Sequence, residues 1–224
     1  LTLSDKDFDY LDSNKKEFVK TVLPIIINEN QNILMIRSFV SELKGKLETF
    51  RTLNNKEIRK LNEIAKKYNI KHHNKHKLDL VDEILSNVDI IPNSIALAQA
   101  AIESGWGKSR FAKEYNALFG EYTYDNSKGV IPLERENGDT HLIKAFSSYS
   151  NSVESYFDNI NSHNAYEDFR DIRNIMRERN NFSNVNLLVN KLSTYAEDEN
   201  YINTIRQVIK TNNFSIFDQK TITY

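Results

Sequence analysis

The sequence contains no cysteine, and proline and glycine are scarce, with 3 and 6 residues among 224. The lack of cysteine excludes disulfide bonds and thiolate chemistry. Because proline and glycine are so few, no flexible linker is evident, and N-terminal helices are expected to pack against the rest of the chain. No apolar run approaches the roughly 20 residues that a membrane-spanning helix needs. The 39% of hydrophobic residues is enough for a core.

Neither sign of charge is in excess, since 31 acidic residues face 30 basic ones and the net charge is −1. A nucleic-acid partner is therefore not expected. Three histidines, His72, His73 and His76, lie among lysines without a carboxylate or regular ligand spacing, so no metal site is expected. The glycines fit no phosphate-binding or dinucleotide-binding loop, and nothing in the sequence requires a cofactor.

Apolar residues recur at helical spacing over most of the chain. The segments are 17–48, 55–68, 78–85, 92–104, 150–160, 171–176, 185–192 and 200–210. Pro24 interrupts the first segment, which predicts either a helix that starts near Leu23 or a kink. We expect residues 1–89 to form an N-terminal helical segment packed on a catalytic region at 90–224.

Residues 119–146 depart from the helical pattern. Asn137-Gly138 stands between two extended runs and predicts a β-hairpin. On the first run Glu134 and Glu136 point to the same face of the strand. The fold class is therefore expected to be mainly α, an α+β arrangement of helices with a small β-hairpin.

One helix ends on a carboxylate. Pro92 and Asn93 favour a helix start, and Gly105 favours a stop, which places Glu103 in the last turn. The negative end of the helix dipole and burial beside Trp106 both act to raise the pKa of this carboxyl group. A carboxylic acid that stays protonated near neutral pH can act as a general acid. The alternative is a solvated glutamate at a helix end.

Three motifs in order suggest a family. The run from Ala98 to Ser109, followed by Asn116–Gly120, resembles the AQAxxESGWGxS helix and NxFG turn of glycoside hydrolase family 73, the bacterial N-acetylglucosaminidases. Leu133–Gly138 resembles the TEYxNG hairpin of that family, and Tyr195–Tyr201 resembles its YATDPNY segment. Residues 18–30 resemble its Bax-type subgroup. The resemblance covers about residues 92–210.

The resemblance implies a lysozyme-like fold and a peptidoglycan hydrolase, an endo-β-N-acetylglucosaminidase that cleaves β-1,4 bonds after N-acetylglucosamine. Glu103 corresponds to the general acid, and Glu134 to a second acid that serves as base or assists the substrate's own N-acetyl group. Glu136 is the reserve for that second role. Tyr201 is expected to take part in the chemistry.

Six residues are expected to bind the glycan: Trp106, Asn116, Phe119, Tyr122, Tyr124 and Tyr195. For Trp106 and Phe119 the alternative is packing in the core, and for Tyr195 and Tyr201 it is a half-buried core position. The Thr and Pro of YATDPNY are replaced by Glu197 and Glu199, which leaves the geometry of this loop open.

Peptidoglycan, or a related glycan that contains N-acetylglucosamine, is thus the expected partner. That partner implies export to the periplasm or the exterior of a bacterium. The chain begins at Leu1 with no signal segment, and we expect a processed or trimmed form. Three alternatives stay open: a lytic transglycosylase, an endoglycosidase of N-glycans, and a non-catalytic glycan-binding or scaffold module.

Overall fold

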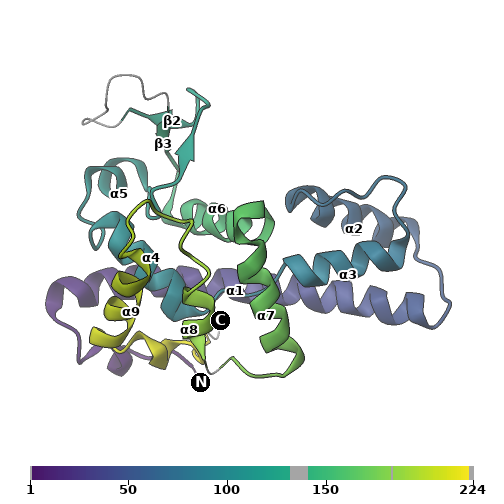
Figure 1. Cartoon of the computed structure of the whole chain (residues 1–224), viewed down its shortest axis with the longest axis horizontal. Helices are drawn as coiled ribbons and strands as arrows, with labels where there is room; N and C mark the ends of the chain where they lie inside the picture. Colours follow the sequence, from purple (N-terminus) through teal and green to yellow (C-terminus); the bar gives the residue numbers. More distant parts are fainter. Residues whose placement is uncertain (1, 132–140, 183, 222–224) are drawn as a thin grey trace. The chain divides into compact units, whose positions relative to one another are not determined.

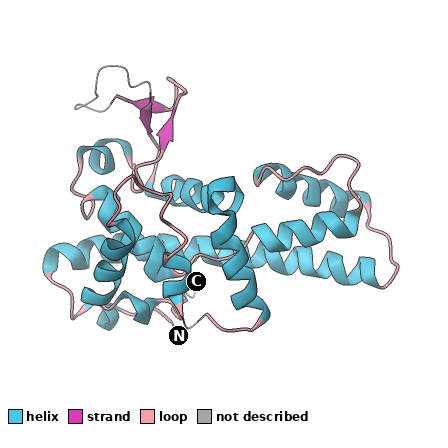
Figure 2. Cartoon of the chain, viewed as in Figure 1, coloured by secondary structure: helices cyan, strands magenta, loops and turns pink. Residues whose placement is uncertain are grey.

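The structure is a computed structural model that describes residues 2–131, 141–182 and 184–221. Helices make up most of it, and the strands form one small sheet (Figure 2). The helices and strands are α1 (Ser13–Glu48), α2 (Asn55–Lys67), α3 (Lys77–Asn87), α4 (Asn93–Ser104), α5 (Arg110–Tyr115), β1 (Tyr122–Thr123), β2 (Gly129–Val130), β3 (Leu142–Lys144), α6 (Tyr149–Ser162), α7 (Glu167–Glu178), α8 (Val185–Val189) and α9 (Tyr201–Thr211). Short 3-10 helices add η1 (Asp5–Phe8), η2 (Asn164–Tyr166) and η3 (Phe214–Phe217).

This architecture confirms the mainly helical class with a small antiparallel sheet. Every segment with helical periodicity contains a helix, and α5 is an additional short helix that the pattern did not predict. Its start is explained by Ser109, whose hydroxyl accepts a hydrogen bond from the main-chain N–H of Ala112 at 3.1 Å. Within the described ranges, none of the helices has both the length and the apolar character to cross a membrane.

Helix α1 begins at Ser13 and continues through Pro24, so the first of the two alternatives, a helix start near Leu23, is wrong. A proline inside a helix removes one main-chain hydrogen bond and crowds the preceding turn. The side chains around it offset that cost, because Val22, Leu23 and Ile26 are all fully buried. Burial of the apolar face therefore outweighs the local preference of proline for a helix start.

The sheet has the order β1-β3-β2, and both pairings are antiparallel. Val130 lies opposite Ile143, so the extended runs on the two sides of Asn137-Gly138 are neighbours, as the hairpin prediction requires. Gly129 is needed for this approach, since a Cβ atom there would come within 2.5 Å of the Cβ atom of Leu142. The turn itself, with Glu134 and Glu136, lies outside the described residues.

The contacts divide the chain into two units. The first contains residues 1–29, 92–157 and 203–224, and the second contains residues 30–91 and 158–202. The boundaries between the units fall within α1, α6 and α9, which Figure 1 labels. The division at residue 89 into a helical segment and a catalytic region stays a prediction, and both units take residues from either side of it.

The core of the first unit is built around α4, in which all residues from Asn93 to Ala101 are buried. The C-terminal segment packs on the start of this helix. Main-chain N–H and hydroxyl of Ser94 both donate to Asp218, at 2.7 and 2.8 Å, and Asn93 donates to the carbonyl of Phe217 at 2.8 Å. Burial raises the pKa of Asp218 to about 6, against the opposing effect of the two Ser94 hydrogen bonds.

The second unit is organised around a buried arginine of α7. Arg173 donates to the carbonyl oxygens of Asn87 and Asp89 and to the side chain of Asn161. The Asp89 carboxylate is fully buried and receives two hydrogen bonds from Arg177, at 2.8 and 2.5 Å. This network ties the segment after α3 to α6 and α7.

Candidate active site

Glu103 lies in the last turn of α4, as predicted, and is half-buried. The helix ends at Gly105, whose φ of 57° is left-handed and whose N–H returns to the carbonyls of Ala101 and Ile102. Residues 105–107 all have positive φ, including Trp106 at 59°. A hydroxyl within the helix stabilises this turn, because the N–H of Gly107 donates to the Ser104 side chain at 2.8 Å. The chain thus reverses directly after the acid.

The predicted NxFG turn lies against the Glu103 side chain. Gly120 has a φ of 62°, and a Cβ atom at this position would stand 3.1 Å from Oε2 of Glu103. Only glycine meets both conditions without strain. Oε2 of Glu103 therefore lies next to the space that a side chain at position 120 would occupy. The raised pKa that the sequence led us to expect for Glu103 stays a prediction.

Helix α6 packs against the NALFG turn. The ring of Phe119 stacks on Tyr156, with centroids 4.0 Å apart and planes inclined by 8°. The Tyr156 hydroxyl donates to the side-chain oxygen of Gln99 at 2.6 Å. Gln99 precedes Glu103 by four residues, so the two side chains share one face of α4. Tyr156 of α6 thus connects two elements: it stacks on the turn through Phe119 and is hydrogen-bonded to α4 through Gln99.

Three of the residues predicted to bind glycan are engaged with protein groups. Trp106 packs edge-on against Phe18 and also faces Phe214, with centroids 5.7 and 6.1 Å away. Phe119 is only 1% exposed. Asn116 ends α5 in a left-handed conformation and donates to the carbonyl of Phe146 at 3.0 Å. These three side chains therefore take part in packing and hydrogen bonding within the first unit.

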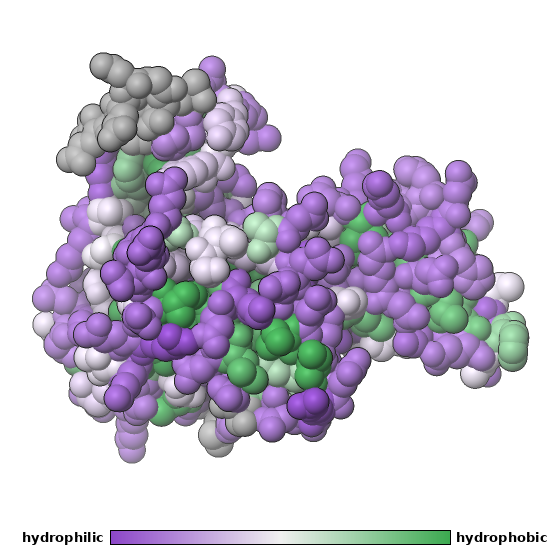
Figure 3. All heavy atoms as spheres, in the orientation of Figure 1, coloured by the Kyte–Doolittle hydropathy of each residue, from purple (hydrophilic) through white to green (hydrophobic). Residues whose placement is uncertain are grey.

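Two predicted residues present rings to solvent. Tyr122 on β1 is 64% exposed, and Tyr124 after it is 77% exposed. The Tyr122 ring lies beside that of His141, with centroids 4.3 Å apart. Figure 3 shows that hydrophilic residues cover most of the face in view.

The tyrosines of the third motif lie together in the second unit. Tyr195 is half-buried and Tyr201 is 4% exposed, and their rings are parallel with centroids 5.8 Å apart. Tyr195 also faces Tyr166 at 6.1 Å. The two tyrosines thus form a pair, as their common motif suggests, and their roles stay predictions. Glu134 and Glu136, the candidates for the second acid, lie outside the described residues.

Sequence reasoning missed several residues around the acid: Gln99, Gly120, Glu121, Ser155 and Tyr156. The spacing of Gln99 to Glu103 is a signal in the sequence, since both lie in the same helix. Glu121 and the residues of α6 carry no such signal, because only the tertiary structure joins Tyr156 to Gln99 and Ser155 to Glu121.

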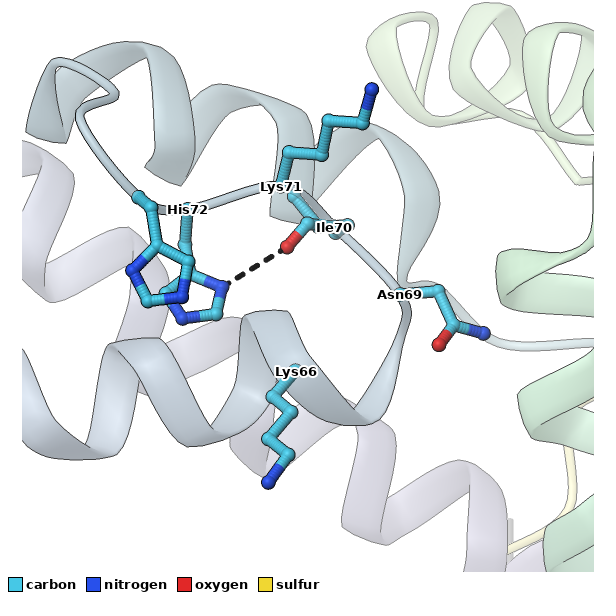
Figure 4. A pocket seen from close by; sticks show the side chains of 6 residues that line it. Lys66, Asn69, Ile70, Lys71 and His72 are labelled. Carbon is cyan, nitrogen blue, oxygen red and sulfur yellow. Dashed lines mark hydrogen bonds between the residues drawn. The ribbon is translucent and has the colours of Figure 1, made fainter.

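The histidine cluster forms a separate feature of the second unit. A hollow of about 460 Å³ is lined by Lys66, Asn69, Ile70, Lys71, His72 and His73. Figure 4 shows the His72 ring turned toward the carbonyl of Ile70, to which its Nδ1 atom is 3.2 Å distant. The two imidazole rings lie against one another with centroids 4.2 Å apart. Within the ranges that the structure describes, no group of His, Cys, Asp or Glu is arranged to hold a metal ion.

Comparisons with known proteins agree with the motifs. Protein bax of Escherichia coli strain K12 is 32% identical over 184 residues, which cover 81% of this chain and 63% of that protein. Peptidoglycan hydrolase FlgJ from the same strain is 37% identical over 92 residues, covering 37% of this chain and 29% of FlgJ. The chain thus spans less than two thirds of the length of these relatives.

A solved structure is also similar: the catalytic domain of the autolysin Auto from Listeria monocytogenes, with a TM-score of 0.44 and 19% identity over 80% of this chain and 96% of that chain. The model of the glucosaminidase family matches residues 78–214. This match includes Glu103, the NALFG turn and both motif tyrosines. Because it spans more than half of the chain, the protein belongs to the glucosaminidase family, described as mannosyl-glycoprotein endo-β-N-acetylglucosaminidase.

Proposed function

We propose that this protein is an endo-β-N-acetylglucosaminidase that hydrolyses β-1,4 bonds after N-acetylglucosamine in bacterial peptidoglycan. The observation that carries the proposal is the position of Glu103, in the last turn of a buried helix and with one carboxylate oxygen next to Gly120. The family match and the name of the FlgJ relatives support the reaction class and the substrate.

In this mechanism Glu103 protonates the oxygen of the leaving sugar as the glycosidic bond breaks. Only the protonated form of the carboxyl group can do so, and partial burial of Glu103 beside Gly120 disfavours the charged form. The α4 dipole acts in the same direction, since a carboxylate at a helix C-terminus is disfavoured. The local structure therefore suits a general acid.

A second group must stabilise or attack the developing oxocarbenium ion. We assign this role to Glu134 on the strength of the family motif, with Glu136 in reserve. Glu134 acts either as the base for a water molecule or by assisting the N-acetyl group of the substrate. The separation of the two carboxyl groups distinguishes these paths.

The glycan contacts are assigned from exposure for Tyr122 and Tyr124, and from the family motif for Tyr201 and Tyr195. Tyr122 and Tyr124 offer exposed rings on which sugar faces can stack. Tyr201 carries a phenol that can hydrogen-bond the N-acetyl group, with Tyr195 packed on its ring. Trp106, Asn116 and Phe119 support the site through their contacts with neighbouring protein groups. Peptidoglycan lies outside the cytoplasmic membrane, so the proposed place of action is the periplasm or the cell exterior.

The test is digestion of purified peptidoglycan with the wild type and Glu103→Gln, followed by mass spectrometry of borohydride-reduced products. We expect new reducing-end N-acetylglucosamine from the wild type and a loss of at least about 100-fold in rate in the variant. Glu114→Gln is the matched control, because Glu114 is an exposed acid of α5 that pairs with Arg110. This control is expected to retain wild-type activity.

Other products would contradict the proposal in informative ways. Anhydro-muramyl ends would identify a lytic transglycosylase. Cleavage of an N-glycan chitobiose core, without action on peptidoglycan, would favour the substrate class in the family description. Glycan binding without turnover by the wild type would indicate a non-catalytic module.

A further inference from the structure

Glu121 is a half-buried acid next to the candidate site, and the proposed reaction assigns it no role. Its two carboxylate oxygens have different surroundings. Oε1 accepts a hydrogen bond from the Ser155 hydroxyl of α6 at 3.3 Å. Oε2 is buried and has no hydrogen-bond partner within the described part of the chain. Burial raises the pKa of Glu121, and the Lys144 charge and the Ser155 hydrogen bond oppose that rise only in part.

Glu121 is tied to two other elements at once. Its main-chain carbonyl accepts from the N–H of Lys144 on β3 at 2.8 Å. The Lys144 ammonium group in turn donates to the Ser155 hydroxyl at 2.5 Å. Lys144, Ser155 and Glu121 thus form a chain of side-chain hydrogen bonds that joins β3, α6 and the residue after Gly120.

One face of α6 contacts residues 118, 119 and 121 of the turn. Ser152, Ser155 and Tyr156 are spaced by three and four residues, so they share one side of the helix. The N–H of Leu118 donates to the Ser152 hydroxyl at 3.1 Å, and Phe119 stacks on Tyr156. Glu121 supplies the last of these anchors. Between Phe119 and Glu121, Gly120 is the residue that lies next to the Glu103 carboxylate.

We propose that Glu121 is a positioning residue for Glu103, which anchors residues 118–121 to α6 and so keeps Gly120 against the Glu103 carboxyl group. This inference rests on the proposed function for its kinetic consequences. The burial of an acid with one unpaired oxygen supports it, because such a group destabilises a fold relative to an apolar side chain of similar size. A residue that served packing alone would be better replaced by leucine.

The test compares Glu121→Leu and Glu121→Gln with the wild type. Leucine removes the anchor and the buried polar group, so the melting temperature is expected to stay equal or rise while kcat falls roughly tenfold with little change in KM. Glutamine keeps an oxygen for the Ser155 hydroxyl and is expected to restore kcat to within about threefold of the wild type. A role in packing alone would move stability and activity together.

A second readout does not depend on turnover. The carboxyl carbon of Glu103, labelled with ¹³C, is assigned as the NMR signal that Glu103→Gln lacks. We expect its titration midpoint to move by more than about half a pH unit in Glu121→Leu and to be largely restored in Glu121→Gln. Glu114→Leu, an exposed change in the same unit, is expected to leave the midpoint in place.

An unmoved Glu103 midpoint together with wild-type kcat in Glu121→Leu overturns the inference. Losses of kcat that only follow a lower melting temperature overturn it as well. If the wild type turns over no glycan, the proposed function fails, and the Glu103 signal alone then decides for or against Glu121.

Discussion

Gly120 combines a left-handed main chain with a carboxylate neighbour, and both features depend on the absence of a side chain. In Gly120→Ala the methyl group is 3.1 Å from Oε2 of Glu103 in the native geometry, at a φ that costs about 1–2 kcal/mol for an L-residue. We expect kcat to fall by roughly ten- to a hundredfold, because small displacements of a catalytic group are costly.

The matched control for this change is Gly45→Ala. Gly45 lies inside α1, and a Cβ atom there meets nothing within 4 Å. Alanine at that position should leave activity unchanged and stabilise the helix by up to about 1 kcal/mol. Equal activities of Gly120→Ala and the wild type would remove Gly120 from the site. Initial rates and thermal unfolding measure both effects.

Asp218 gives a pH dependence of stability at the residue scale. Burial raises its pKa to about 6 in the folded state, above the value of 3.8 for a free aspartate. The folded state therefore holds the proton more tightly than the unfolded state, and this group makes stability fall as pH rises from 3.8 to about 6. Asp218→Asn keeps an acceptor for Ser94 and has no proton to lose.

We expect the free energy of unfolding of Asp218→Asn, relative to the wild type, to rise across this pH range and to level off above it. Denaturant unfolding at several pH values measures the difference. A difference that does not vary with pH would show that Asp218 titrates as an ordinary exposed carboxylate.

At the scale of elements, the end of α4 depends on a buried hydroxyl. Ser104 is fully buried, donates to the carbonyl of Ala100 at 2.5 Å and accepts from the N–H of Gly107 at 2.8 Å. Ser104→Ala leaves that N–H without its partner, and we expect a loss of about 1–3 kcal/mol in the free energy of unfolding. Activity should fall too, because the turn after Glu103 loosens.

Ser150→Ala is the control, since Ser150 is an exposed residue of α6. It should change neither stability nor activity. Thermal unfolding and glycan digestion compare the two variants, and an unchanged stability in Ser104→Ala would show that the turn holds without this hydroxyl.

At the scale of the whole molecule, buried charges hold helices together in the second unit. Burial pushes the pKa of Asp89 up, but hydrogen bonds and charges of the surrounding arginines outweigh it, so the net pKa is lowered. The stability from this group is therefore present near neutral pH and is lost as pH falls through the lowered value. Burial also lowers the pKa of Arg173 to about 9, which leaves it charged at neutral pH.

We expect Asp89→Ala to destabilise the protein by roughly 3–5 kcal/mol, because it leaves buried arginine charges uncompensated. Asp82→Asn is the matched control, since Asp82 pairs with Lys44 at a half-exposed site and is expected to contribute at most about 1 kcal/mol. Circular dichroism during denaturation measures both. Similar small losses in the two variants would contradict the structural role of the network.

Much of the secondary structure was predictable, because it follows from local signals. Apolar periodicity located the long helices, and Gly105 located the end of α4. The start of α1 was not predictable in this way, since burial on both sides of Pro24 overrides the local preference of proline. Helix α5, with six residues, is too short for its periodicity to be read.

The candidate site was likewise predictable only where its features depend on local sequence signals. By itself the sequence determined that an acid ends a helix, that two glycines follow it, and that motifs of one family occur in order, since each helix signal and each motif is a relation between near neighbours in the chain. Only the tertiary structure decided that Gly120 lies next to the Glu103 carboxylate, that Tyr156 holds Gln99, and that Glu121 is anchored on α6. These contacts join residues far apart in sequence, and their geometry depends on how the core packs around α4.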